Sequence, residues 1–351
     1  MVPLYRNRRA AAIENADLRV TVVEGGGHIA EIFDKTSGVN PLWTPVWPSL
    51  EPSDFGPAHH GAYGSGADGA LLAGILGHNL CLDIFGGPSA DEAAAGLTAH
   101  GEASVEKYDL QTPSATELIA RVTLPRAALR VERRLTLVDR ALRIRESVEN
   151  LSGCDRPVGW TQHVTLSPPF LAKGTTRFRA SATRSKVFET IFGSADYLKL
   201  GAEFDWPMAP RAAGGDVDLR VFTDAPVSNA YTTHLMDQSR DEAFFVAFSP
   251  EYQLAFGYVW SSRDFPWMGI WEENLSRPHA PWAGKSITRG MEFGVSPMPE
   301  SRRQMIDRGT LFGVPTYRWI PAKRTIDVEY WAVAQTAQAV PETLNRQSGN
   351  G

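Results

Sequence analysis

Alternation of apolar and polar side chains is the feature that most limits how this chain can fold. Residues 129–138 read LRVERRLTLV and residues 142–150 read LRIRESVEN, with leucine, isoleucine and valine recurring two positions apart. Successive side chains of a strand point to opposite sides of a sheet, so this pattern is typical of half-buried antiparallel strands. The few residues between the two runs predict a hairpin. Similar runs predict further strands at 18–23, 28–33, 103–110, 115–124, 157–166, 218–223, 243–249, 253–260, 287–294 and 325–333.

Helical periodicity is scarce. Residues 89–95, SADEAAA, are the best helical candidate, with Ser89 or Asp91 as the N-cap, and the helix would be short. Many short strands separated by Gly, Pro and Asp indicate a sandwich or barrel and exclude a βαβ arrangement. We therefore predict an all-β chain, a large antiparallel β-sandwich forming one domain over residues 1–340, followed by a disordered tail at 341–351.

Composition excludes several classes of partner. The 351 residues carry a net charge of −5 without long charged runs, whereas a nucleic-acid partner requires a basic face. No apolar stretch approaches the roughly 20 residues that span a membrane, and the N-terminus lacks the apolar core of a signal peptide. The two cysteines, Cys81 and Cys154, could form a disulfide, although reduced and buried thiols are the simpler expectation. A cytoplasmic location is the default.

Common catalytic motifs do not explain this sequence. Residues 64–69, GSGADG, match a dinucleotide-binding string but follow no predicted strand and open no βαβ unit. The adjacent His59 and His60 would point in opposite directions on an extended chain. They lie in a long Gly- and Pro-rich segment, residues 38–78, which also contains Trp43 and Trp47. Segments of this length without regular structure usually border a functional site.

Ionisable residues stand beside turn glycines or aromatic residues at four places. These are His100-Gly101, the run from Trp160 to His163, the stretch from His234 to Asp237, and the pair of segments 267–274 and 289–294. Each has a simple structural alternative. A strand histidine is more often a core or edge residue than a catalyst, Glu292 could be a solvated strand residue, and Glu272-Glu273 could be a surface turn.

In chain order, these pieces resemble the galactose mutarotase (aldose 1-epimerase) superfamily. In that family, two strands ending in an asparagine lead into a strand with a key histidine, as LRVERRLTLV…LRIRESVEN leads into PVGWTQHVTL here. His100-Gly101 resembles the His-Gly that starts an earlier strand of the family. Residues 265–274 and 287–299 resemble its late strand pair, whose second member carries the catalytic glutamate before a proline. The resemblance covers roughly residues 17–335 and implies the large sandwich of that superfamily.

The resemblance implies an acid–base site without cofactor or metal. Glu292 would remove the proton of the C1 hydroxyl, His163 would protonate the ring oxygen, and His100 would be a hydrogen-bonding partner of the sugar. Acid and base are expected on opposite sides of the sugar, with the three side chains around a space one sugar ring wide. Further residues expected to bind the substrate are Asp237, Trp160, Gln162, Trp206, Trp271 and Glu272, with the tryptophans as an apolar platform. A phosphosugar would in addition need a cation near the mouth, and Arg263, Arg277 and Lys285 are equally open candidates.

The sequence therefore predicts an aldose 1-epimerase-like enzyme that interconverts the anomers of a hexose or hexose derivative. The alternative is a carbohydrate-binding protein of the same fold without this activity. A third possibility, an interaction module whose exposed tryptophans meet a protein partner, would place them on a flat convex surface, whereas a sugar site gathers them in a cleft. The identity of the sugar and the oligomeric state are not predicted.

Overall fold

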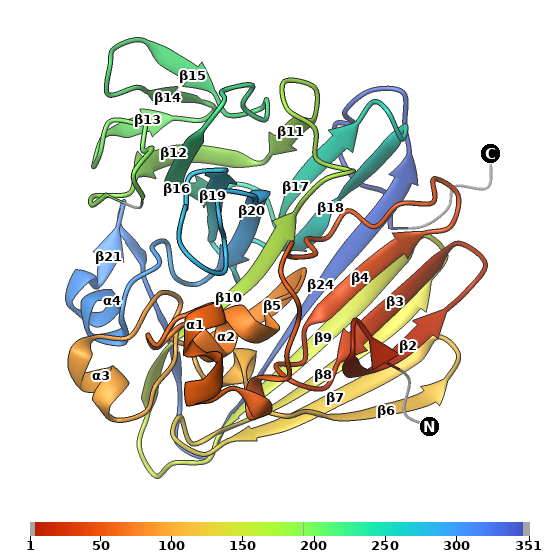
Figure 1. Cartoon of the computed structure of the whole chain (residues 1–351), viewed down its shortest axis with the longest axis vertical. Helices are drawn as coiled ribbons and strands as arrows, with labels where there is room; N and C mark the ends of the chain where they lie inside the picture. Colours follow the sequence, from red (N-terminus) through yellow and green to blue (C-terminus); the bar gives the residue numbers. More distant parts are fainter. Residues whose placement is uncertain (1–3, 192, 347–351) are drawn as a thin grey trace.

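The computed structural model describes residues 4–191 and 193–346, and two large antiparallel sheets dominate it (Figure 1). Strands account for 46% of the structure and helices for 9%, which confirms the predicted all-β sandwich. The 12-stranded sheet contains, in spatial order, β1 (Leu4–Tyr5), β2 (Arg8–Glu14), β3 (Leu18–Val23), β4 (Ile29–Asp34), β5 (His78–Asp83), β10 (Arg156–Leu166), β20 (Ile287–Gly294), β19 (Trp267–Asn274), β16 (Ser228–Met236), β12 (Ala182–Val187) and β13 (Glu203–Asp205), with β23 (Arg318–Ile320) paired to β10.

The second sheet packs against the first. It contains, in spatial order, β11 (Arg177–Ala180), β17 (Glu242–Ser249), β18 (Leu254–Ser261), β24 (Thr325–Thr336), β9 (Ala141–Asn150), β8 (Leu129–Val138), β7 (Glu117–Leu124) and β6 (Asp109–Ser114). Two small hairpins are formed by β14 (Met208–Pro210) with β15 (Asp216–Asp218), and by β21 (Thr310–Leu311) with β22 (Val314–Pro315).

The helices are short and lie outside the sandwich. They are α1 (His60–Tyr63), α2 (Gly69–Gly74), α3 (Ala90–Ala94) and α4 (Arg302–Arg308), together with the 3₁₀ turns η1 (Pro52–Asp54), η2 (Pro57–His59) and η3 (Glu102–Ser104). Figure 1 shows α1 and α2 in front of β5 and β10. The predicted helix is α3, and Ser89 is its N-cap, accepting a hydrogen bond from the Glu92 amide.

The alternating segments fold as the sequence indicates. Strands β8 and β9 form the predicted hairpin, in which Val138 faces Ala141 and Asp139 adopts a left-handed φ of 49° in the turn. The apolar side chains of β8 are buried except at Val138, the last residue, and the polar side chains between them are half-buried or exposed except that of Arg133. This guanidinium occupies an inward position and is neutralised by Glu146 on β9, with 2.7 Å between Nε and Oε1.

Two of the predicted strands are wrong. Residues 218–223 leave the strand conformation after Asp218, whose carboxylate accepts hydrogen bonds from the backbone and side chain of Arg220 and so closes a turn. The segment predicted as a strand from residue 103 instead begins with η3, and β6 starts only at Asp109. The buried Glu102 accepts hydrogen bonds from the amides of Arg126 and Ala127, which ties this turn to the connection between β7 and β8 of the second sheet.

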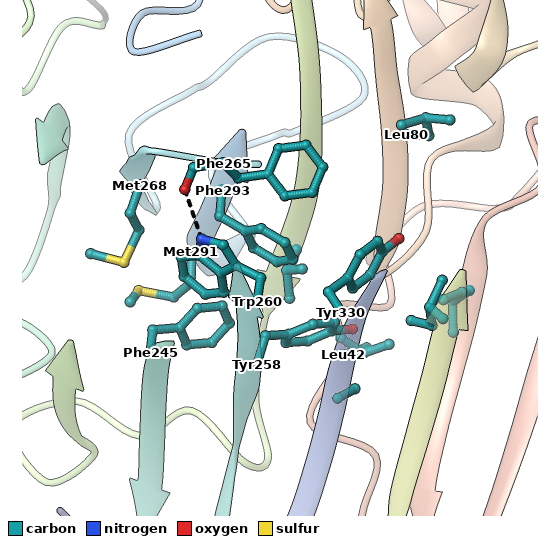
Figure 2. Close-up of a cluster of buried hydrophobic side chains, with 14 of the residues drawn as sticks. Leu42, Leu80, Phe245, Tyr258, Trp260, Phe265, Met268, Met291, Phe293 and Tyr330 are labelled. Atoms are coloured by element: carbon teal, nitrogen blue, oxygen red, sulfur yellow. Dashed lines mark hydrogen bonds between the residues drawn. The ribbon is translucent and has the colours of Figure 1, made fainter. Parts of the chain in front are cut away.

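The hydrophobic core lies between the two sheets and is rich in aromatic side chains (Figure 2). Trp260 of β18 stacks on Phe293 of β20, with ring centroids 4.2 Å apart, and its indole N–H donates to the carbonyl of Phe265. Each such ring buries roughly 150–250 Å² on folding, which at about 25 cal/mol per Å² contributes several kcal/mol. The cluster thus fixes β18 against β20, and β20 carries Glu292 on its opposite face.

Other expectations concern the tail and the cysteines. Of the predicted disordered tail, residues 347–351 lie outside the described residues, while Leu344 is 7% exposed and packs with Phe244 and Val246. Both cysteines are free, Cys81 buried as expected and Cys154 exposed, so the expectation of burial is wrong for the second. Within residues 4–191 and 193–346, no helix combines the length and the apolar character needed to cross a membrane.

Candidate active site

Five neighbouring strands of the 12-stranded sheet, in the order β5, β10, β20, β19 and β16, position the candidate site. One face of these strands, the inner face, packs against the second sheet. The other, the outer face, is covered by residues 38–77 and 84–105 and by the segments that follow β19 and β20. Because side chains alternate along a strand, His163 of β10 lies on the outer face, and Gln162 next to it lies on the inner face. Both are buried.

The structure brings together the three residues expected to be catalytic. The Nε2 atom of His163 lies 3.0 Å from Oε1 of Glu292, and the His100 and His163 rings are 4.6 Å apart between centroids. His163 and Glu292 are 5% and 2% exposed, and the hydroxyl of Thr165 lies 3.1 Å from the second ring nitrogen of His163. The structure differs from the expectation in one respect. The acid and the base were expected on opposite sides of the sugar, whereas His163 and Glu292 are in direct contact on the same face of the sheet.

Two glycines provide the space that Glu292 occupies. A Cβ atom at Gly290 would lie 2.6 Å from Oε1 of Glu292, and one at Gly269, directly opposite Glu292 across the strand pair, would lie 2.2 Å from the hydroxyl of Tyr231. Real Cβ atoms do not approach other atoms so closely. The two glycines therefore allow the carboxylate to lie flat against the sheet, where it reaches His163.

His100 is contributed by the covering segment and not by the sheet. It has a left-handed φ of 63°, and its backbone is fixed by hydrogen bonds from its amide to Gly86 and from the Leu82 amide to its carbonyl. Burial, with smaller contributions from His163 and His28, holds the pKa of His100 well below its ordinary value. His100 is therefore neutral at neutral pH and carries a single ring proton.

The three residues lie at a cavity of about 390 Å³ that is walled largely by aromatic and aliphatic side chains. Trp271 and Trp282 line it, and the Trp271 ring centroid is 5.9 Å from that of His163. Behind them, Trp43 stacks on Trp282 with centroids 5.8 Å apart, and Trp47 meets the same ring edge-on. The expectation that residues 38–78 border a functional site agrees with this packing. The remaining wall includes Leu71, Leu72, Ile75, Phe85, Pro88 and Tyr231.

Of the three cations considered for a phosphosugar, Arg277 lines this cavity. Its guanidinium lies over the Trp282 ring at 4.6 Å and forms an ion pair with Glu273, 3.3 Å between Nε and Oε2. Burial lowers the pKa of Arg277. Arg263 instead pairs with Asp241 in a separate surface groove. Glu273 is only 1% exposed, so the alternative that Glu272-Glu273 forms a surface turn is wrong.

Several residues expected to bind the sugar lie elsewhere. Trp160, Gln162 and Glu272 are on the inner face, because each is an odd number of positions from an outer-face residue of its own strand. Trp160 and Gln162 donate hydrogen bonds to Glu146, and Glu272 accepts one from Ser228.

Two further residues that were expected to bind the sugar also lie away from the cavity. Trp206 packs edge-on against His234, with ring centroids 5.0 Å apart, and lines a different groove. Asp237 is partly exposed and accepts hydrogen bonds from Ser239 in a surface turn. Of the six residues expected to bind substrate, only Trp271 lines the cavity with His100, His163 and Glu292.

Sequence reasoning missed other lining residues. Asp68, Phe85, Tyr231 and Trp282 all line the cavity. Tyr231 is an outer-face neighbour of Trp271 across the β16–β19 pair, but it was missed because the strand that carries it was not predicted. The other three belong to loops whose path depends on packing that no local pattern specifies.

The fold is that of known sugar-related proteins. A galactose mutarotase related enzyme from Lactobacillus acidophilus matches 95% of this chain over 99% of its own, with a TM-score of 0.61 at 12% identity. A galactose mutarotase-like protein from Clostridium acetobutylicum matches 95% over 97% of its own, with a TM-score of 0.60 at 13% identity. One from Lactobacillus casei matches 93% over its whole length, with a TM-score of 0.55 at 14% identity. No protein-family model matches the sequence, and neither does any curated protein. The chain has the galactose mutarotase-like fold.

Proposed function

We propose that this protein is an aldose 1-epimerase-like enzyme that interconverts the anomers of a hexose or hexose derivative without a cofactor. The observation that carries the proposal is the contact between His163 and Glu292 at the cavity, where a carboxylate and an imidazole lie 3.0 Å apart. The fold, shared with galactose mutarotase-like proteins, supports it. His100 beside His163 supplies a third polar group on the same side.

Contact between acid and base suits the chemistry of an anomeric carbon. The hydroxyl oxygen and the ring oxygen are bonded to the same carbon, C1, so two adjacent groups can reach both. The Glu292 carboxylate takes the proton of the C1 hydroxyl while the His163 imidazolium protonates the ring oxygen. The bond between C1 and the ring oxygen breaks, leaving an open-chain aldehyde. Each such proton transfer typically contributes about 10²–10⁴-fold to the rate.

Ring closure reverses these transfers. Rotation about the C1–C2 bond presents the other face of the aldehyde to the C5 hydroxyl, which loses its proton to neutral His163 as the ring closes. Glu292, now protonated, returns its proton to the aldehyde oxygen. No proton is gained or lost over the cycle, because ring closure itself returns His163 to the imidazolium and Glu292 to the carboxylate.

The apolar wall suits the faces of a sugar ring. Trp271 and Trp282 present aromatic surface to the cavity, and C–H groups of pyranoses pack on such surfaces. Arg277 and Asp68 at the same cavity offer a donor and an acceptor to hydroxyl groups. Tryptophans gathered around a concave site favour a sugar over the alternative of a protein partner, which would require a flat exposed patch.

Polarimetry on freshly dissolved sugars tests the proposal. We expect the wild-type protein to accelerate the approach of one or more pure anomers to rotational equilibrium, with exchange NMR reporting the same rate at equilibrium. Binding measured on the same sugars separates the two functions of this fold. Protein that binds a sugar and leaves the rate at that of buffer is a carbohydrate-binding protein, and the enzymatic proposal is then rejected for that sugar.

A further inference from the structure

Asn79 lies beneath the candidate site and contacts His100. It is on the outer face of β5, directly opposite His163 across the strand pair, and it is fully buried. Its amide nitrogen is 3.1 Å from Nδ1 of His100, and it does not line the cavity. Together with the backbone hydrogen bonds to Leu82 and Gly86, this contact fixes both the backbone and the ring of His100.

The contact selects one tautomer of His100. An amide nitrogen can only donate, so Nδ1 of His100 must accept, and the single proton of the neutral ring must be on Nε2. The opposite orientation of the amide would place its oxygen against Nδ1 and require the proton there. The two orientations therefore predict different protonated nitrogens.

We propose that Asn79 is a positioning residue that keeps His100 as the Nε2–H tautomer, so that His100 donates a hydrogen bond into the cavity. The part of this inference that concerns sugar turnover depends on the function proposed above, and the tautomer itself does not. In that reaction His163 and Glu292 move protons, and the His100 N–H holds a sugar oxygen in place.

NMR of ¹⁵N-labelled protein tests the tautomer without any reference to activity. In the wild-type protein at neutral pH, we expect the His100 ring to show a protonated Nε2 and an unprotonated Nδ1, with the signals identified by their loss in His100→Gln. Asn79→Asp replaces the donor by a carboxylate that only accepts, so the proton should move to Nδ1. A wild-type ring protonated at Nδ1, or a tautomer unchanged in Asn79→Asp, would overturn the proposal even in a protein with no mutarotase activity.

The pH dependence of turnover then distinguishes positioning from a general structural defect. The titratable and charged groups around His100 are His28, Asp68, His163, Arg277 and Glu292. A carboxylate at position 79 raises the pKa of His100 relative to the wild type, because it stabilises the imidazolium. Below that pKa both ring nitrogens carry protons and Nε2 still donates. Above it the remaining proton is on Nδ1, and the donor is lost.

We therefore expect kcat of Asn79→Asp to be lower than that of the wild type by about 10-fold at alkaline pH, the usual worth of one hydrogen bond. The ratio of the two kcat values should recover as the pH is lowered. Asn79→Ala should show no such recovery, because it offers neither donor nor carboxylate. Asn40→Asp, a matched change at a half-buried asparagine that bonds only to backbone groups, should leave both tautomer and turnover unchanged. A pH-independent loss of activity in Asn79→Asp would assign Asn79 a purely structural role.

Discussion

The two faces of the 12-stranded sheet carry polar clusters that come in part from the same strands, β5 and β10, and the outer cluster lines the candidate cavity. On the inner face, His78 of β5 and Gln162 of β10 are joined by a hydrogen bond of 2.9 Å. On the outer face, the next residues along the same strands are Asn79 and His163, which lead to His100 and Glu292.

The inner cluster is a closed network centred on Glu146. Its two carboxylate oxygens accept four hydrogen bonds, with distances between 2.6 and 3.0 Å, from Arg133, Tyr330, Trp160 and Gln162. Gln162 passes the network on to His78, whose other ring nitrogen lies 3.0 Å from the hydroxyl of Tyr258. All acceptor positions of the carboxylate are used, as a buried charge requires.

The difference shows that the covering layer, and not the presence of a histidine, decides what a strand histidine can do. The second sheet covers the inner face and contributes Glu146, which is satisfied by Arg133 and Tyr330 of its own sheet and by Trp160 and Gln162 of β10. The segments of residues 38–77 and 84–105 cover the outer face and leave a cavity at His163 and Glu292. We therefore expect substitutions on the inner face to change stability, and substitutions on the outer face to change activity.

The largest effect is expected from Glu146→Gln, at the centre of the network that joins the second sheet to the inner face. This change leaves the Arg133 guanidinium buried without its counter-charge, which typically costs about 3–5 kcal/mol. The free energy of unfolding, measured by urea denaturation, should fall by that amount. Glu149→Gln on the same strand is the control, because its pair with Arg130 is exposed and such pairs contribute at most about 1 kcal/mol. Equal effects of the two variants would contradict the assignment of the inner network as structural.

Glu292→Gln should show the opposite profile. The amide keeps the size of the side chain but cannot accept a proton, so catalysed mutarotation should fall by about 10²-fold or more, while sugar affinity stays within a few-fold. The free energy of unfolding should change far less than in Glu146→Gln. On one preparation, polarimetry measures the mutarotation rate and urea denaturation measures the free energy of unfolding. A variant that loses folding along with activity would place Glu292 in the structural class, and unchanged turnover would remove it from the mechanism.

Sequence patterns predicted the half-buried strands β7, β8 and β9, but of the strands covered on both faces they predicted only some, such as β10 and β18. Strands β7, β8 and β9 alternate because one side of their sheet meets solvent. Strands β5 and β16 were not predicted, and each of their residues is buried. A strand covered on both sides needs no polar residues at alternate positions, so the period of two disappears.

The site was predictable where a motif resemblance and strand parity agree. His100, His163 and Glu292 were found through the resemblance, and the structure brings them together. Parity alone could have corrected other assignments: if His163 faces the cavity, Gln162 and Trp160 cannot, since they lie one and three positions away. Arg277 was left open among three cations, because its loop is placed by packing on Trp282 and by Glu273 and by no local pattern.

A smaller effect is expected where the backbone of the outer face makes room for Glu292. In Gly290→Ala, the new methyl group would meet Oε1 of Glu292 at 2.6 Å, so the carboxylate must turn away from His163. Displacements of about 1 Å in a reacting group cost up to roughly 10²-fold, and we expect mutarotation to fall by about 10-fold. Gly153→Ala is the matched control, because its Cβ would meet no atom within 4 Å. Full activity in Gly290→Ala would show that Glu292 need not contact His163.

The smallest effect concerns His234, an inner-face histidine of β16. Burial, followed by the charge of Arg289, lowers its pKa to about 3, whereas an unfolded histidine titrates near 6.5. The stability that this neutral ring contributes is retained above about pH 6.5 and is lost as the pH falls from there towards 3, because the unfolded chain then binds the proton more readily. Between pH 6.5 and 5.5 the loss amounts to about 1 kcal/mol for one such group.

His234→Gln should remove this contribution, so that the decline in unfolding free energy over that interval becomes shallower by about 1 kcal/mol. Urea denaturation at several pH values measures the slope. His279→Gln, at an exposed loop position, should keep the slope of the wild type. Burial lowers the pKa of both His78 and His234 on the inner face, so these rings are neutral in the folded protein. Acid should therefore destabilise the packing between the two sheets. An identical slope in wild type and His234→Gln would show instead that the acid sensitivity of this protein comes from other groups.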